Sequence, residues 1–227
     1  MLKTLVLSPV VVLQALWVAA RASRLPEASG PRAGQIGQGP RLRVLVVGDS
    51  SAAGVGADHQ DDALGGQVAA QLADRYTVDW QVIAASGATT RDSLATLKAA
   101  PVQAVDFAVI ALGVNDAKNG VSLAAWTARY GDILTLLRDQ LGARTICVSG
   151  LPPLRAFPIL PWPLRDVLGA RAEAFDARLR QIAQARPGVV YVPMDFALDV
   201  STMASDGFHP GPEVYRAWAK RVARAYG

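Results

Sequence analysis

Residues 44–54 read VLVVGDSSAAG, so a run of four apolar residues ends abruptly in a Gly-Asp-Ser turn that is followed by small residues. A short apolar run that stops at a glycine is typical of a buried strand. In open α/β sheets, ligands bind beyond the carboxyl ends of such strands. Ser50 lies at that end, where its hydroxyl could be presented to a ligand, although a serine in this place could also simply cap the following helix.

Strands and helices are expected to alternate along the rest of the chain. Further strands are predicted at residues 78–84, 107–112, 145–148 and 189–192. Helices are predicted at residues 63–75, 91–98, 123–141, 165–185 and 212–225. This alternation favours an α/β fold in which a parallel sheet is covered by helices on both faces.

Composition excludes several classes of protein. The 227 residues suffice for one domain with a sizeable core, and a hydrophobic content of 51% excludes a disordered chain. The formal net charge of +4 is concentrated at the start, because residues 1–43 hold six basic side chains and one acidic, whereas residues 44–227 hold 17 basic and 18 acidic. The nearly neutral globular part gives no basic face for nucleic acid. The single cysteine, Cys147, allows no internal disulfide and is expected in the core.

Residues 1–24 form an N-terminal apolar segment, with a basic residue before the apolar run and Arg21 and Arg24 after it. It could be a signal peptide cleaved at Ala20-Arg21-Ala22, an uncleaved anchor at the short end of the length that spans a bilayer, or a helix lying in the membrane interface. The arginines that follow the run favour a cytoplasmic catalytic domain, but they leave the exported side open. We therefore expect membrane association through this segment.

Two other stretches stand out by composition. Residues 25–41 are rich in Gly, Pro and Ala and predict a linker, so the folded domain is expected over residues 42–227. Residues 151–163 are rich in proline and large apolar side chains and follow a predicted strand. We expect them to wall an acyl pocket or to face a membrane, and the alternative is ordinary packing against the helices.

Small polar turns follow three of the predicted strands: Gly48-Asp49-Ser50, Ser86-Gly87 and Gly113-Val114-Asn115-Asp116. If the strands are parallel, these turns share one edge of the sheet. A fourth segment precedes the last predicted helix and holds one of the two histidines of the chain: Asp206-Gly207-Phe208-His209-Pro210.

These segments supply the parts that acyl transfer needs. The hydroxyl of Ser50 is a weak nucleophile that requires an adjacent base, and His209 can take its proton. Asp206, three residues earlier, can fix the tautomer of His209 and stabilise the imidazolium. The backbone N–H groups of Ser50 and Gly87 and the side-chain amide of Asn115 are candidate donors to an oxyanion. The alternative is a helix cap, a packing glycine, a turn asparagine and a surface histidine combined by chance.

In these four blocks the chain resembles the SGNH hydrolases, also called the GDSL esterase/lipase family, over about residues 43–227. The resemblance implies a three-layer α/β/α sandwich of flavodoxin-like type with a parallel sheet of about five strands. It also implies a nucleophile at Ser50, oxyanion donors at Gly87 and Asn115, and a triad completed by Asp206 and His209. Ser51 stands where the family usually has leucine, which bears on substrate preference rather than on the chemistry.

The expected activity is that of a serine esterase that cleaves carboxylic esters or thioesters through an acyl-enzyme, with no metal and no cofactor. The apolar N-terminal segment and residues 151–163 favour a lipid-like acyl substrate. The alternatives within the same family are removal of acetyl groups from a carbohydrate and transfer of the acyl group to another acceptor. A membrane-tethered binding protein without activity is the alternative from a different class, and the intact Ser50, Asp206 and His209 argue against it. The oligomeric state is left open.

Overall fold

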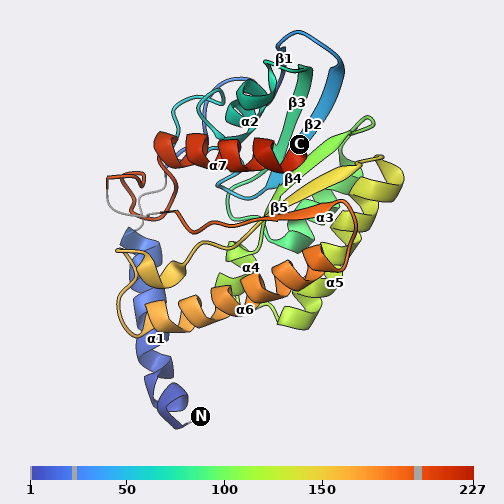
Figure 1. The fold of residues 1–227 in the computed structure, drawn as a ribbon. Helices are drawn as coiled ribbons and strands as arrows, with labels where there is room; N and C mark the ends of the chain where they lie inside the picture. The colour runs from blue at the N-terminus through green and yellow to red at the C-terminus, as the bar shows by residue number, and fades with distance from the viewer. Residues whose placement is uncertain (1, 22–24, 197–200) are drawn as a thin grey trace.

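A central sheet organises the computed structural model, which describes residues 2–21, 25–196 and 201–227 (Figure 1). In these residues the sheet has six strands: β1 (Ala33–Ile36), β2 (Arg41–Gly48), β3 (Thr77–Ala84), β4 (Phe107–Ala111), β5 (Thr145–Ser149) and β6 (Val189–Val192). Their spatial order is β1-β3-β2-β4-β5-β6. Strands β2 to β6 are parallel, and β1 pairs antiparallel with β3 at the edge.

Helices cover both faces of the sheet (Figure 1). They are α1 (Leu2–Arg21), α2 (Leu64–Leu72), α3 (Thr90–Ala99), α4 (Val114–Lys118), α5 (Leu123–Thr135), α6 (Leu164–Gln184) and α7 (Pro212–Tyr226). A π-helical turn, η1 (Leu136–Gln140), continues α5, and a 3₁₀ turn, η2 (Leu154–Ala156), lies in the loop after β5.

The alternation of side chains along β2 divides the core into two layers. Val44 and Val46 pack on the side of α2 and α7. Leu45 and Val47 pack on the side of α3, α5 and α6. All four are buried, which is the reason that residues 44–47 read as a continuous apolar run instead of an alternating one. The expected three-layer α/β/α fold is confirmed.

The edge strand β1 was not expected, because it lies inside the stretch that composition predicts as a linker. Residues 33–36 pair with residues 78–81 of β3 through backbone groups. Backbone pairing at a sheet edge needs no apolar pattern, and the side chains of β1 are exposed. Glycine and proline content therefore could not reveal this strand.

The N-terminal helix α1 packs on the body of the protein through Val11 and Val18, which contact the core on the side of α6. Across residues 2–21, 25–196 and 201–227, no helix has the length and apolar character needed to cross a membrane. Ala22, the last residue of the predicted cleavage site, lies outside the described residues.

Candidate active site

The turn that carries Ser50 folds tightly against the end of β2. A Cβ atom at Gly48 would lie 2.4 Å from Ala52 Cβ and 2.7 Å from the carbonyl oxygen of Ala111, so only glycine fits there. The Asp49 amide donates to that same Ala111 carbonyl at 3.2 Å, which ties the turn to the neighbouring strand β4. Ser50 is therefore held at the carboxyl edge of the sheet, between two parallel strands.

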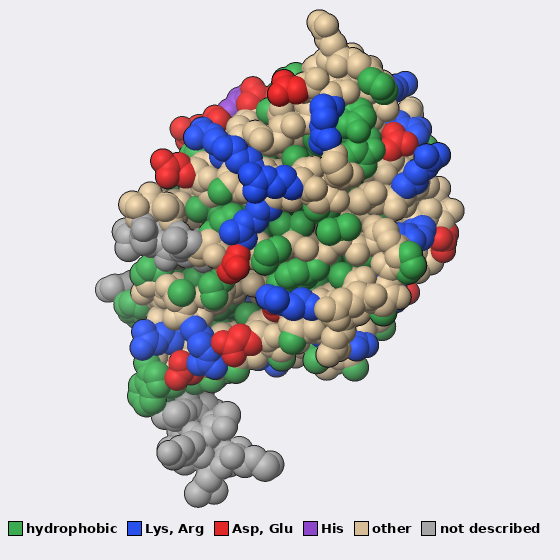
Figure 2. Space-filling view, viewed as in Figure 1, with side chains coloured by type: hydrophobic (Ala, Val, Ile, Leu, Met, Phe, Trp, Pro, Cys, Tyr) green, Lys and Arg blue, Asp and Glu red, His purple; other side chains and the backbone are tan. Residues whose placement is uncertain are grey.

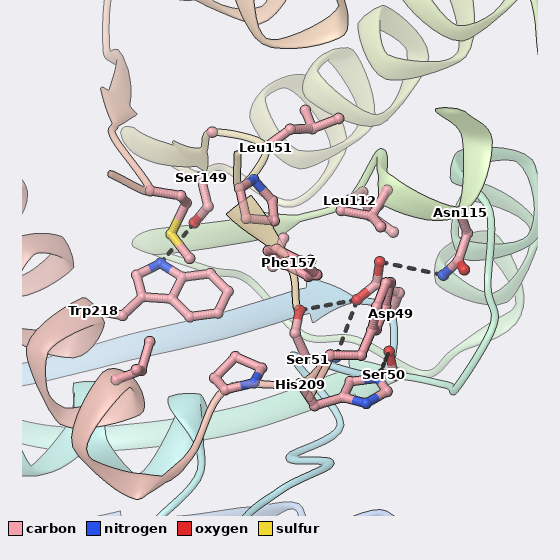
Figure 3. A pocket seen from close by; sticks show the side chains of 18 of the residues that line it. Asp49, Ser50, Ser51, Leu112, Asn115, Ser149, Leu151, Phe157, His209 and Trp218 are labelled. Carbon is pink, nitrogen blue, oxygen red and sulfur yellow. Dashed lines mark hydrogen bonds between the residues drawn. The ribbon is translucent and has the colours of Figure 1, made fainter. Parts of the chain in front are cut away.

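Ser50, His209 and Asp206 lie in a hydrogen-bonded series. Ser50 Oγ is 2.9 Å from His209 Nε2, as Figure 3 shows, and His209 Nδ1 is 2.5 Å from Asp206 Oδ2. The other carboxylate oxygen of Asp206 accepts the backbone N–H groups of Phe208 and His209 at 2.9 and 3.0 Å. The local turn before α7 thus fixes both the carboxylate and the ring that it contacts.

The charge state of Asp206 follows from these contacts. Burial raises the pKa of Asp206, but the hydrogen bonds from the His209 ring and from the two backbone amides outweigh burial, so this pKa lies below its usual value. The ionised carboxylate accepts the Nδ1–H of His209, which leaves Nε2 free to accept the proton of Ser50. This is the arrangement by which a base activates a serine hydroxyl.

Asn115 lies in the first turn of α4 and is almost fully buried. Its Nδ2 donates to the Ala88 carbonyl at 3.1 Å and, over a longer 3.3 Å, to Asp49 Oδ2 (Figure 3). The other oxygen of Asp49 accepts the amide and the hydroxyl of Ser51 at 3.1 and 2.9 Å. Burial raises the pKa of Asp49, although the hydrogen bonds from Ser51 oppose that rise. Asp49 thus links the turn after β2 to the helix that carries Asn115.

A second contact holds the C-terminal end of α4. Arg171 of α6 donates to the carbonyls of Ala117 and Val121, both at 2.7 Å. These carbonyls lie at the end of α4 and just beyond it, where a helix leaves acceptors without partners. The guanidinium therefore satisfies two carbonyls and fixes the short helix on which Asn115 is placed.

Gly87 lies on the loop after β3 with φ of +80°. A Cβ there would meet nothing within 4 Å, so the backbone conformation and not crowding is the reason for glycine. Gly87, Asn115 and Ser50 line the same cleft. The structure thus brings all five predicted site residues to one edge of the sheet.

Two residues of this region were missed by the sequence interpretation, because they lie in the predicted linker. Glu27 Oε1 accepts the backbone N–H of Ser86, the neighbour of Gly87, at 2.7 Å. Arg32 pairs with Glu27 and donates to the Ala84 carbonyl at 2.8 Å. The one usable signal was that Glu27 is the single acidic residue of residues 1–43.

Two cavities meet at Ser50 and His209. The smaller, of about 70 Å³, is mostly apolar, and the hydrogen bond between Trp218 Nε1 and Ser149 Oγ at 3.0 Å lies in its wall (Figure 3). The larger is a cleft of about 750 Å³, bordered by α1, α4 and α6. Residues 151–163 border the catalytic edge as predicted, because they contribute side chains to both cavities.

The charged side chains outside the cavities show no basic face in the view of Figure 2, where Lys and Arg side chains lie among Asp and Glu. The salt bridges reflect the same mixture, for example Arg43 with Asp106 at 2.8 Å and Arg180 with Asp176 at 3.0 Å.

Comparison with known proteins agrees with this geometry. A model of the GDSL-like lipase/acylhydrolase family matches residues 46–217. A curated relative, a GDSL-like esterase of Mycobacterium tuberculosis, is 28% identical over 187 residues, which are 77% of this chain and 58% of the relative. This chain therefore spans less than two-thirds of the length of that protein.

Solved structures share the fold. The lipase Lip_vut3 from a goat rumen metagenome has a TM-score of 0.61 at 21% identity, over 81% of this chain and 97% of that one. The psychrotrophic esterase EstA from Pseudoalteromonas sp. has a TM-score of 0.62 at 16% identity, over 81% and 96%. Since the family model covers more than half of the chain and all four blocks at the sheet edge, the chain belongs to the GDSL-like lipase/acylhydrolase family, whose members are hydrolases that act on esters.

Proposed function

We propose that the protein cleaves carboxylic esters or thioesters through an acyl-enzyme formed on Ser50. The observation that carries this proposal is the contact of 2.9 Å between Ser50 Oγ and His209 Nε2, with Asp206 2.5 Å behind the ring. A nucleophile, a base and a group that orients the base are thus within hydrogen-bonding reach of one another.

In the first half-reaction, Ser50 Oγ attacks the carbonyl carbon while His209 Nε2 takes the hydroxyl proton. The tetrahedral intermediate collapses, the bond to the leaving group breaks, and His209 returns the proton to the departing oxygen or sulfur. Water then attacks the acyl carbon while His209 Nε2 takes one of its protons. The second tetrahedral intermediate collapses, the bond between the acyl carbon and Ser50 Oγ breaks, the acid leaves, and His209 returns the proton to Ser50. Asp206 stays ionised and stabilises the imidazolium in both halves.

The oxyanion would be bound by the N–H groups of Ser50 and Gly87 and by the Asn115 amide. The Nδ2 atom of Asn115 has two hydrogens, and the contact with Asp49 is the longer of its two hydrogen bonds. We expect the oxyanion to replace that longer contact, while the shorter hydrogen bond to the Ala88 carbonyl keeps the amide in place.

A lipid-like acyl substrate is favoured over an acetylated carbohydrate, because both cavities at Ser50 are lined mainly by apolar side chains. Exposed apolar side chains also support association of α1 with a lipid surface, since Leu13 is 66% exposed, Trp17 47% and the nearby Trp162 59%. The cytoplasmic side is proposed from the flanking arginines alone.

The test is hydrolysis of p-nitrophenyl esters by the full chain, with Ser50→Ala beside it and a fluorophosphonate as a label for the nucleophile. Turnover by the wild type that Ser50→Ala abolishes, together with labelling at Ser50, supports the esterase. Absence of both turnover and labelling in a folded protein would contradict the esterase and favour the hypothesis of a non-catalytic binding protein.

A further inference from the structure

Helix α1 presents three faces, which follow from its 3.6 residues per turn. Val11, Gln14 and Val18 are the partly buried positions of residues 9–18, at the spacing of one helix face. Val11 and Val18 contact the core, and Gln14 fixes the helix to the start of α6. Its Oε1 accepts the Leu164 amide at 3.0 Å, and its Nε2 donates to the Trp162 carbonyl at 2.6 Å.

The neighbouring face of α1 borders the large cleft through Val12, Ala15 and Leu16, and Val18 lines this cleft as well. Leu13 lies about 60° around the helix from Leu16, beyond the edge of this face. It is absent from the cleft wall, although it is as exposed as Leu16, at 66% against 63%. The two leucines therefore have the same chemistry and exposure and differ in what they face.

The remaining cleft wall is apolar along most of its length. Besides α1, the wall includes four leucines from η2, the loop after it and α6: Leu154, Leu160, Leu164 and Leu168. The polar part of the lining includes Ser50, Gly87 and His209 of the catalytic edge, and Lys118 and Asn119 at the end of α4. An occupant with a polar, reactive end and a long apolar body would match this distribution.

We propose that α1 forms one wall of the groove for the acyl chain, and that Val12 and Leu16 set a preference for long-chain acyl esters. This inference rests on the proposed esterase function. The small cavity of about 70 Å³ holds only a short group, whereas the cleft of about 750 Å³ is in the range of sites that enclose extended ligands. Helix α1 lies outside the part of the chain that matches the family model, which begins at residue 46.

The experiment compares Leu16→Gln with the matched control Leu13→Gln, both in the full chain, whose intact mass verifies that α1 is retained. Each is assayed on p-nitrophenyl octanoate and acetate, below the concentrations at which the esters aggregate. We expect Leu16→Gln to lower the ratio of kcat/KM for octanoate over acetate about tenfold, the scale of a lost apolar contact in a specificity pocket. Leu13→Gln should keep the wild-type ratio, and Val12→Thr should lower it less.

Three results would overturn the inference. If Leu16→Gln and Leu13→Gln have equal octanoate-to-acetate ratios of kcat/KM, the cleft-facing side of α1 does not contact the acyl chain. A loss on octyl acetate instead of octanoate would assign the cleft to the alcohol part of the ester. If the protein isolated from its host lacks residues 1–24, the groove has no wall from α1. Absence of turnover and of Ser50 labelling is different, because it defeats the proposed esterase itself and the inference with it.

Discussion

Replacing Glu27 by alanine should slow catalysis, although residue 27 is distant in sequence from every catalytic block. Glu27 accepts the Ser86 amide at 2.7 Å and pairs with Arg32, which in turn donates to the Ala84 carbonyl. All these contacts hold the loop that presents the Gly87 N–H. Without the carboxylate, the Ser86 N–H must donate to water and Arg32 loses its ion-pair partner. The loop then becomes more mobile at the Gly87 N–H, the candidate oxyanion donor.

The size of the effect can be estimated from these contacts. A hydrogen bond to a charged group contributes about 1.5–3 kcal/mol, and a half-exposed ion pair adds about 0–1 kcal/mol. Since the Glu27 side chain is 31% exposed, the lower part of that range applies, and we expect about 1.5–2 kcal/mol lost from the free energy of unfolding. Losing an oxyanion donor outright costs about 10²–10³ in kcat. The Asn115 contact with the Ala88 carbonyl still holds the loop, so about a tenfold loss is expected.

The stability loss should depend on pH. Burial raises the pKa of Glu27, but the hydrogen bonds from Ser86 and Arg32 outweigh burial, so its pKa in the folded protein is below the ordinary value of 4.5. The carboxylate therefore stabilises the fold fully above pH 4.5, and this contribution disappears as the pH falls through the lowered pKa. Urea unfolding should show a gap between wild type and Glu27→Ala at pH 7 that closes in acid.

The matched control is Asp79→Ala. Asp79 is also paired with an arginine, Arg41, and its pKa is also lowered, but it lies near the start of β3, away from the catalytic edge. It should lose comparable stability and keep its kcat on p-nitrophenyl esters. The contact of Glu27 with Ser86 does not position the loop for catalysis if Glu27→Ala keeps the wild-type kcat. The same conclusion follows if Glu27→Ala and Asp79→Ala lower kcat by the same factor.

Three further substitutions test the roles at the sheet edge by steady-state kinetics on p-nitrophenyl esters. Asp206→Asn should lower kcat by about 10⁴ with little change in KM, because His209 loses the ionised acceptor that fixes its tautomer; an unchanged kcat would remove Asp206 from the mechanism. Asn115→Ala should lower kcat by about 10²–10³, and a change in KM alone would contradict an oxyanion role. Arg171→Met should cost about 2–3 kcal/mol in urea unfolding and lower kcat through α4, with Arg171→Lys rescuing part of both, since lysine replaces one of the two hydrogen bonds.

Much of this site could be predicted from the sequence because each block is local. Ser50 follows an apolar run directly, and parallel strands bring their carboxyl ends to one edge, so Gly87 and Asn115 were expected beside it. The proximity of Asp206 and His209 was also visible, because His209 follows Asp206 by three positions within one turn. These inferences need only short stretches of chain and the topology of the sheet.

Contacts made across long sequence separations could not be predicted in this way. Glu27 and Ser86 are 59 residues apart, and their contact joins a side chain to a backbone group, which leaves no pattern in either segment. Strand β1 likewise pairs through its backbone. The apolar run of α1 is compatible with a leader, an anchor or a cleft wall, and only its contacts with α6 and the cleft separate its faces.

Substrate selection should therefore depend on the walls and not on the catalytic blocks. The blocks place a carbonyl at Ser50 in the same way for any ester, whereas the two cavities that meet there differ about tenfold in volume, 70 against 750 Å³. Ser51 illustrates the point, because its hydroxyl hydrogen-bonds Asp49 at 2.9 Å and its side chain lines the smaller cavity. A leucine there would fill part of that cavity and leave Asp49 without this donor. The same substitution would leave the wall formed by α1 unchanged, so the two cavities can be altered independently.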